Sequence, residues 1–189
     1  MLITLPNLPV LFQDVLWTLA IPQQKNRSEF TSRTQIVGQP GAEQWTATVQ
    51  ALAPVNDAEE RAWHAFLALC RGAENSFYLP ARPRVQTTAA APTVTAAVAG
   101  NAAVTLSSVA NVAPGMWATV RQANGHRRLV KITAIAGSNI QFEPALTGAP
   151  SIGVTLDIAD PYALVRMADN RRPLPTIGRA FEFAVEEAL

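Results

Sequence analysis

The side chains that most often perform catalysis or bind metals are scarce in this sequence. It contains two histidines, His64 and His126, and one cysteine, Cys70. A single cysteine cannot form an internal disulfide or a multi-cysteine metal site, and two histidines are too few for a histidine-rich metal cluster. Cys70 has no histidine placed to activate it, and a cysteine on an apolar helix face usually behaves as a small hydrophobic side chain. We therefore expect neither a metal nor a cofactor.

The motifs of common enzyme classes are also missing from the sequence. There is no phosphate-binding P-loop, no Gly-x-Gly-x-x-Gly, no nucleophile elbow and no His-Glu-x-x-His zinc motif. Glu59 and Glu60 are adjacent, so they would point to different faces of a helix and cannot form an acid–base pair. His64 would lie at the flank of the same helix. The sequence predicts a protein that is not an enzyme.

A basic hairpin tip is the first feature suited to binding a partner. Asn124-Gly125 is a dipeptide typical of two-residue hairpin turns, and His126, Arg127 and Arg128 follow it directly. Such a tip can contact an acidic partner, whereas a simply solvated tip is the more common arrangement. Arg33, at the end of a polar loop that begins at Gln23, is a further candidate for an interface.

The four tryptophans are the second such feature, because aromatic rings can stack against sugars or bases. Trp17, Trp45 and Trp63 fall on patterns that face a core, which favours packing over binding. Trp117 follows Pro114-Gly115 and is the least constrained, so it is the best candidate for an exposed ring.

Composition limits the class of partner. The 189 residues include 15 Lys and Arg against 14 Asp and Glu, a net charge of +1. Nucleic acid is therefore not the expected main partner, because neutralising phosphates requires a basic surplus. No apolar stretch is long enough to span a membrane, and the N-terminal residues lack the basic region of a secretion signal. We expect no membrane insertion.

The elements that would position these side chains are mostly strands. Alternation or β-rich composition predicts strands over residues 15–21, 30–37, 45–51 and 77–79, with 23–28 as a turn or loop. One helix is predicted over 57–71. Asn56 can cap it, Glu59 can complete the cap, and acidic residues in its first turn suit the helix dipole. Trp63, Phe66, Leu67 and Cys70 form one apolar stripe. The core is expected to contain Trp45, Trp63, Phe66, Leu67 and Phe77.

The composition changes near residue 86, which indicates a second unit. Five short β-runs follow, and they suggest a small barrel or compact sandwich. The runs span 103–106, 117–121, 127–135, 139–142 and 154–158. Further strands at 162–167 and 181–185 need partners, and we expect them to return to the first unit. The predicted fold is mainly β: a discontinuous β-sandwich of residues 1–86 and 159–189 with one amphipathic helix, carrying an inserted small β domain at 87–158.

Several short motifs occur in the order found in one group of viral proteins. Arg33-x-Gln35, Gly38-Gln39-Pro40-Gly41 and a strand from Trp45 to Val49 are followed by Ala65-Phe66-Leu67 on the helix, Gly72, and Ser76-Phe77-Tyr78-Leu79-Pro80. This order resembles the core of the distal tail protein and minor tail protein M type family, which belongs to the tail tip of long-tailed bacteriophages. Pro114-Gly115-Met116-Trp117 and Arg128-Leu129-Val130-Lys131-Ile132 resemble β domains inserted in phage tail proteins.

The resemblance implies a structural function. Proteins of this family form a ring, usually a hexamer, that joins the tail tube to the tip hub or baseplate around the DNA channel. The expected partners are thus other copies of the chain, the tail tube protein and the hub protein, with DNA only passing through the lumen. The expected location is the virion, after synthesis in the bacterial cytoplasm. Contacts are expected at edge strands near Trp17 and Phe183.

A carbohydrate-binding module is the alternative function. In that interpretation the inserted domain contacts sugars on the host surface, with Trp117 or a neighbour as the exposed aromatic ring. A tail-borne hydrolase is disfavoured, because the sequence offers no paired carboxylates or nucleophile in a recognisable arrangement.

Overall fold

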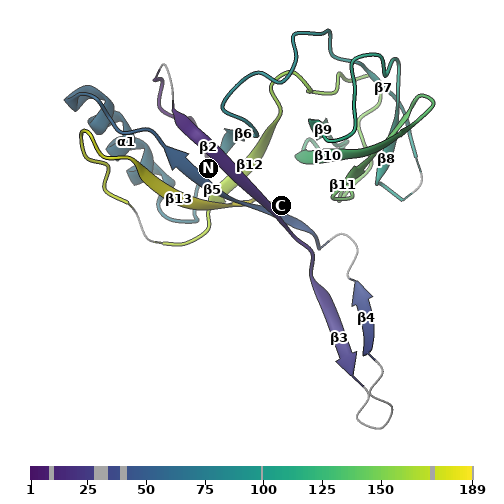
Figure 1. The fold of residues 1–189 in the computed structure, drawn as a ribbon, viewed down its shortest axis with the longest axis horizontal. Helices are drawn as coiled ribbons and strands as arrows, with labels where there is room; N and C mark the ends of the chain where they lie inside the picture. The colour runs from purple at the N-terminus through teal and green to yellow at the C-terminus, as the bar shows by residue number, and fades with distance from the viewer. Residues whose placement is uncertain (9–10, 28–33, 39–41, 99, 171–172, 189) are drawn as a thin grey trace.

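The fold is mainly β, as the sequence predicts, and the described residues form one helix and three sheets (Figure 1). A computed structural model describes residues 1–8, 11–27, 34–38, 42–98, 100–170 and 173–188. Along the chain the elements are β1 (Leu2–Ile3), β2 (Phe12–Ala20), β3 (Gln23–Arg27), β4 (Thr34–Gly38), β5 (Gln44–Ala51), α1 (Asp57–Cys70), β6 (Ser76–Pro80), β7 (Val94–Ala97), β8 (Ala103–Leu106), β9 (Trp117–Arg121), β10 (Arg127–Ala136), β11 (Asn139–Glu143), β12 (Tyr162–Met167) and β13 (Phe181–Glu187).

The first sheet combines strands from both ends of the chain. Its six strands lie in the order β1-β6-β12-β13-β5-β2. The late strands β12 and β13 therefore fill the gap between β6 and β5, and they pair with them antiparallel. The second sheet forms entirely from the residues between β6 and β12. The domain limits 1–86 and 159–189 for the first unit and 87–158 for the second remain predictions. The first sheet does contain strands from both sides of the second sheet in the chain, as those limits require.

The second sheet has the order β7-β8-β11-β10-β9 and curls into a half-barrel. The segment predicted as a strand at 154–158 bridges the two edge strands instead of extending one of them. Val94 donates a backbone hydrogen bond to Val154 on one side, and Thr119 donates one to Asp157 on the other. Because its bonds alternate between two partners, this segment makes isolated bridges and no regular strand. The structure also adds β7, which the alanine-rich composition around it obscured.

The hairpin between β9 and β10 differs from the predicted two-residue turn. Arg121 pairs with Arg127, and the backbone N–H of Gln122 donates to the carbonyl of His126 at 2.8 Å. The loop therefore spans three residues, and Gly125 occupies its left-handed position with φ of +86°. Glycine adopts that conformation without steric cost, which explains why this position carries it.

The helix forms as predicted, and its cap is visible in detail. The side chain of Asn56 accepts a hydrogen bond from the N–H of Glu59 at 2.9 Å, and Glu59 accepts one from the N–H of Val55 at 3.0 Å. Its apolar stripe covers the first sheet. Trp63 makes edge contacts with Phe181 at 5.1 Å between ring centroids. The helix ends at Cys70, one residue before the predicted end, because Arg71 adopts a left-handed conformation.

A two-stranded arm extends from the body of the molecule (Figure 1). The segment 23–28 was predicted as a turn or loop because it is polar, but Gln23–Arg27 forms β3 and pairs with β4. Pairing with another strand, rather than burial of apolar side chains, organises this segment. Residues 28–33, which include Arg33, lie outside the described residues.

Two hydrophobic clusters fill the two units. All five expected core residues (Trp45, Trp63, Phe66, Leu67 and Phe77) are buried, and all five belong to the cluster under the first sheet. Over the residues that the structure describes, no helix is both long and apolar enough to cross a membrane.

Candidate functional site

A cluster of three tryptophans lies where the two sheets meet. The rings of Trp45 and Trp117 are 4.9 Å apart between centroids, and Trp17 lies 6.3 Å from Trp45 and 6.2 Å from Trp117. The indole N–H of Trp45 donates to the carbonyl of Leu129 at 2.8 Å. The cluster therefore joins β2 and β5 of the first sheet to β9 and β10 of the second.

Trp117 is consequently no free stacking platform, contrary to the expectation of an exposed ring. Trp17 and Trp45 pack against its ring, and the ammonium group of Lys131 lies 5.4 Å from its centroid. A sugar would have to displace these neighbours to stack there. Sequence alone could not reveal this arrangement, because the partners are about 70 and 100 residues away along the chain.

Arg128 also differs from the expected basic tip, because it is completely buried beside Glu187. Its Nε lies 3.8 Å from Oε1 of Glu187, and its Nη2 donates to the carbonyl of Glu43. Successive side chains of a strand point to opposite faces. For this reason Arg127 and Arg128 are separated, with Arg127 near the surface and Arg128 inside.

Burial shifts both members of this pair toward their neutral forms. It raises the pKa of Glu187 to about 7, while the charge of Arg128 and a hydrogen bond from the backbone of Trp45 act in the opposite direction. Burial likewise lowers the pKa of Arg128, opposed by Glu187 and Glu43. The pair connects β10 with β13, so it is a structural contact between the two sheets.

The third residue of the predicted tip, His126, is half-buried. Burial lowers its pKa, and the positive charge of Arg128 lowers it further. His126 is therefore mainly uncharged at neutral pH. Of the three residues expected to form a basic tip, only Arg127 presents a charged group near the surface.

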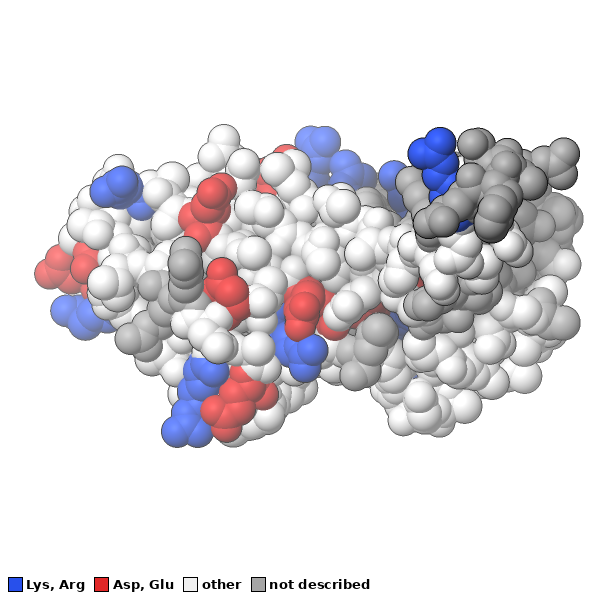
Figure 2. Space-filling view, turned by 90° about the horizontal axis from the view of Figure 1, so that it is seen from below, with Lys and Arg blue, Asp and Glu red and all other residues white. Residues whose placement is uncertain are grey.

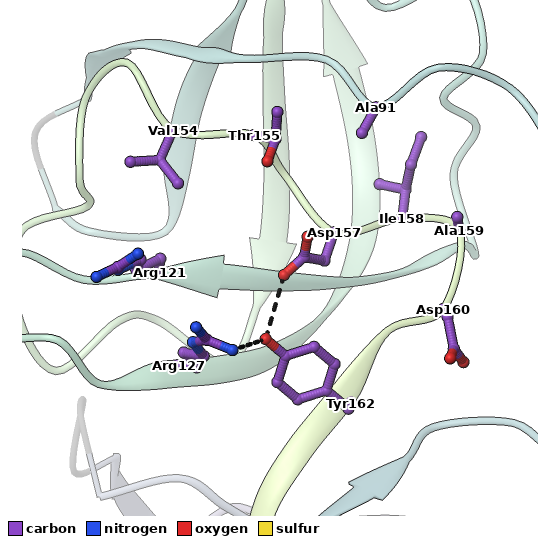
Figure 3. A pocket seen from close by; sticks show the side chains of 10 residues that line it. All are labelled: Ala91, Arg121, Arg127, Val154, Thr155, Asp157, Ile158, Ala159, Asp160 and Tyr162. Carbon is purple, nitrogen blue, oxygen red and sulfur yellow. Dashed lines mark hydrogen bonds between the residues drawn. The ribbon is translucent and has the colours of Figure 1, made fainter.

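Arg127 borders a pocket of about 430 Å³ between the second sheet and the start of β12 (Figure 3). Its guanidinium group donates a hydrogen bond to the hydroxyl of Tyr162, and that hydroxyl donates to Oδ2 of Asp157 at 3.3 Å. Burial and the charge of Asp157 raise the pKa of Tyr162. The other residues that line the pocket are Ala91, Arg121, Val154, Thr155, Ile158, Ala159 and Asp160.

The pocket combines two guanidinium groups, two carboxylates and hydroxyl groups, which suits binding of a polar ligand. Sequence reasoning singled out only Arg127 among these residues. The predicted two-residue turn at Asn124-Gly125 would place Arg121 opposite Arg128, so it did not indicate the observed pairing of Arg121 with Arg127. Asp157 and Tyr162 come from a distant segment, and no sequence signal indicated them.

The other candidates for chemistry have structural surroundings. Nε2 of His64 lies 2.8 Å from the carbonyl of Pro175. Burial raises the pKa of Cys70 to about 11, so its thiol stays protonated at neutral pH and is a weak nucleophile. Glu59 is engaged in the helix cap. In the described ranges of the chain, no three His, Cys, Asp or Glu side chains are grouped to hold a metal ion.

Charge is dispersed on the face of the molecule that carries the arm. Figure 2 shows acidic and basic side chains interspersed among uncharged residues over the part of this face that is described. This distribution agrees with the net charge of +1.

The edge of the first sheet that β2 forms is the remaining surface of interest. Among the described strands only β5 pairs with β2, so the other side of β2 has no strand partner. Large apolar side chains continue from β2 into the arm: Leu16 is 50% exposed, Ile21 49% and Val37 41%. An unpaired edge with exposed apolar side chains is suited to pairing with another chain.

No protein-family model matches the chain, and no curated protein matches its sequence.

Proposed function

We propose that this protein is a structural component of a bacteriophage tail tip, a distal tail protein that forms a ring between the tail tube and the tip hub or baseplate. The observation that carries the proposal is the unpaired edge of β2, which continues into the β3–β4 arm. The ordered motifs between Arg33 and Pro80, which resemble the tail-tip family, support it independently.

A ring made of identical copies needs two different complementary surfaces on every copy. The free edge of β2 offers backbone hydrogen-bonding groups, and the arm offers strands that reach away from the body. Leu16 and Val37 add exposed apolar area along this route. An arm that lies against a neighbouring copy would repeat around the ring and close it. In the virion DNA would only pass through the lumen, and the tube and hub proteins would cover the two faces of the ring.

The experiment is a mass measurement by light scattering and native mass spectrometry over a range of concentrations. We expect a closed oligomer of about six copies, which is the usual number in the family that the sequence resembles. Leu16→Glu and Val37→Glu should each shift the protein to monomers, because a charge on the shared surface would be desolvated. Leu69→Glu is the matched control, since Leu69 is similarly exposed at 54% but lies on α1.

The proposal also predicts assembly on tail components. A chain that closes only on its neighbours would be monomeric alone and would form rings on isolated tail tubes. A protein that stays monomeric both alone and in the presence of tubes would contradict the proposal. Equal loss of oligomers in Leu69→Glu would show that the assembly surface is not the β2 edge.

A further inference from the structure

Two arginines of the second sheet lie directly opposite each other at the pocket that Tyr162 also lines. Arg121 on β9 pairs in register with Arg127 on β10. Like charges at directly opposed positions destabilise a sheet unless an anion lies between or beside them. No acidic side chain among the described residues lies within ion-pair distance of either guanidinium group. The guanidinium groups therefore form no direct ion pair with a carboxylate, and Asp157 reaches Arg127 only through the hydroxyl of Tyr162.

The guanidinium group of Arg127 is held in place before any ligand arrives. Its central carbon lies 5.7 Å from the ring centroid of Tyr78 and 5.6 Å from that of Tyr162. It also donates a hydrogen bond to the hydroxyl of Tyr162 (Figure 3). A guanidinium has five N–H donors in a fixed fork, so donors remain for a ligand. Holding a donor in position in advance reduces the entropy that binding costs.

Acceptors lie in the same pocket. Asp157 accepts a hydrogen bond from the hydroxyl of Tyr162 at 3.3 Å, and both Asp157 and Asp160 line the pocket. Carboxylates accept hydrogen bonds from ligand hydroxyl groups, whereas they repel a single ligand group that carries two negative charges. The site therefore favours a sugar unit with one negative charge and several hydroxyl groups over inorganic phosphate. The volume of about 430 Å³ lies within the usual range of ligand sites, roughly 300–1,000 Å³.

We propose that this pocket binds a hexuronic acid unit of an acidic polysaccharide. The sugar carboxylate accepts hydrogen bonds from Arg121 and Arg127, and the sugar hydroxyls donate to Asp157. Val154 and Ala91 provide apolar wall against the ring carbons. Arginine suits the first contact because its planar fork matches a carboxylate. The site is distinct from the tryptophan cluster and does not depend on ring formation by the β2 edge.

The test measures binding of defined sugars by NMR titration and calorimetry. The probe is trigalacturonate, and its methyl ester is the matched ligand, because esterification removes the charge and keeps the hydroxyl groups. Inorganic phosphate tests the anion without hydroxyl groups. We expect saturable binding of trigalacturonate, at least tenfold weaker binding of the ester, and no saturation with phosphate at the same concentrations.

Protein variants identify the site. Arg121→Gln should weaken binding of trigalacturonate about tenfold or more, since a hydrogen bond to a charged group is lost. Arg121 is exposed, so this variant should keep the fold. Tyr162→Phe removes the hydroxyl that anchors Arg127 and should also weaken binding. Arg61→Ala, a change at an exposed arginine on α1, is the control and should bind like the unmodified protein.

Three results would overturn the proposal. The first is absence of saturable binding by trigalacturonate. The second is equal binding of the ester or of phosphate, which would show a site for neutral sugars or for any anion. The third is unchanged binding in Arg121→Gln and Tyr162→Phe, which would place the sugar elsewhere. Oligomer mass is measured on the same variants, so failure here and failure of the ring proposal can be told apart.

Discussion

At the residue scale, Glu187 links protonation to folding. Its pKa in the folded protein is raised from the ordinary value of 4.5 to about 7, chiefly by burial. Between these two values the folded state holds a proton that the unfolded state has released. The free energy of unfolding should therefore decrease as the pH rises from about 4.5 to about 7 and then level off. The shift corresponds to a change on the order of 3 kcal/mol.

The variant Glu187→Gln isolates this effect. It should remove the decline between pH 4.5 and 7, because the amide does not titrate. Urea unfolding of both proteins at several pH values measures the difference. The comparison matters because His126 acts in the opposite direction: its pKa is lowered in the folded state, so its contribution to stability increases with pH. His126 is present in both proteins and cancels. Glu182→Gln, at an exposed position of the same strand, should leave the decline unchanged.

The sequence could predict those features of the candidate site that arise from neighbouring residues, but not contacts between segments far apart in the chain. The hairpin signal at Asn124-Gly125 correctly placed Arg127 beside a tight connection. It could not show that Arg128 is buried, because the partner Glu187 lies at the far end of the chain. Nor could it place Tyr162 in the pocket. Side chains from distant segments meet only through tertiary packing, which local patterns do not encode.

At the element scale, the N-terminal cap of α1 should make a measurable contribution to the free energy of unfolding. Asn56 accepts a hydrogen bond from Glu59 at a helix end where backbone N–H groups lack partners. Asn56→Ala should lower the free energy of unfolding by about 1 kcal/mol. Asn56→Ser, which keeps a capping oxygen, should lower it by much less. Urea unfolding measures both. Equal losses in the two variants would show that the cap itself contributes nothing.

The same contrast between local and distant signals explains which elements the sequence predicted. The helix carries its own cap and a regular apolar stripe, so periodicity was sufficient. Strands such as β5, with alternating buried residues, were equally clear. β3 was missed because its side chains are polar and its structure depends on pairing with β4. The bridging segment 154–158 was predicted as a regular strand, because composition does not reveal that two different edges share it.

At the scale of the whole molecule, polar contacts join the segment after β6 and strand β12 to the second unit, in addition to the tryptophans. The side chain of Gln86 donates to the carbonyls of Trp117 and Ile158, both at 2.9 Å. The hydroxyl of Thr119 donates to the carbonyl of Tyr162 at 2.7 Å. These contacts, with the buried Arg128, connect the units at several points. A mutation in one unit should therefore affect the stability of the other.

Trp117 is the residue at which this coupling can be tested. Its ring contacts Trp17 and Trp45 of the first sheet. Trp117→Ala should lower the free energy of unfolding by about 3 kcal/mol. This is at the low end for removal of a large aromatic side chain, because the ring is only partly buried. It should also divide a single thermal transition into two, since each unit keeps its own core. Calorimetry detects this as a calorimetric enthalpy that exceeds the van 't Hoff enthalpy.

Val104→Ala is the control for that experiment, because Val104 is fully buried in the second core and does not belong to the core cluster of the first sheet. Lost packing should lower the free energy of unfolding by about 2 kcal/mol, and with it the midpoint, while the transition stays single. If Trp117→Ala also unfolds in one transition, the tryptophan cluster is not what couples the units, and the polar contacts of Gln86 and Thr119 must be sufficient. If the unmodified protein already unfolds in two steps, the two sheets are independent folding units, and the pocket, which includes Tyr162 of β12, forms only when both are folded.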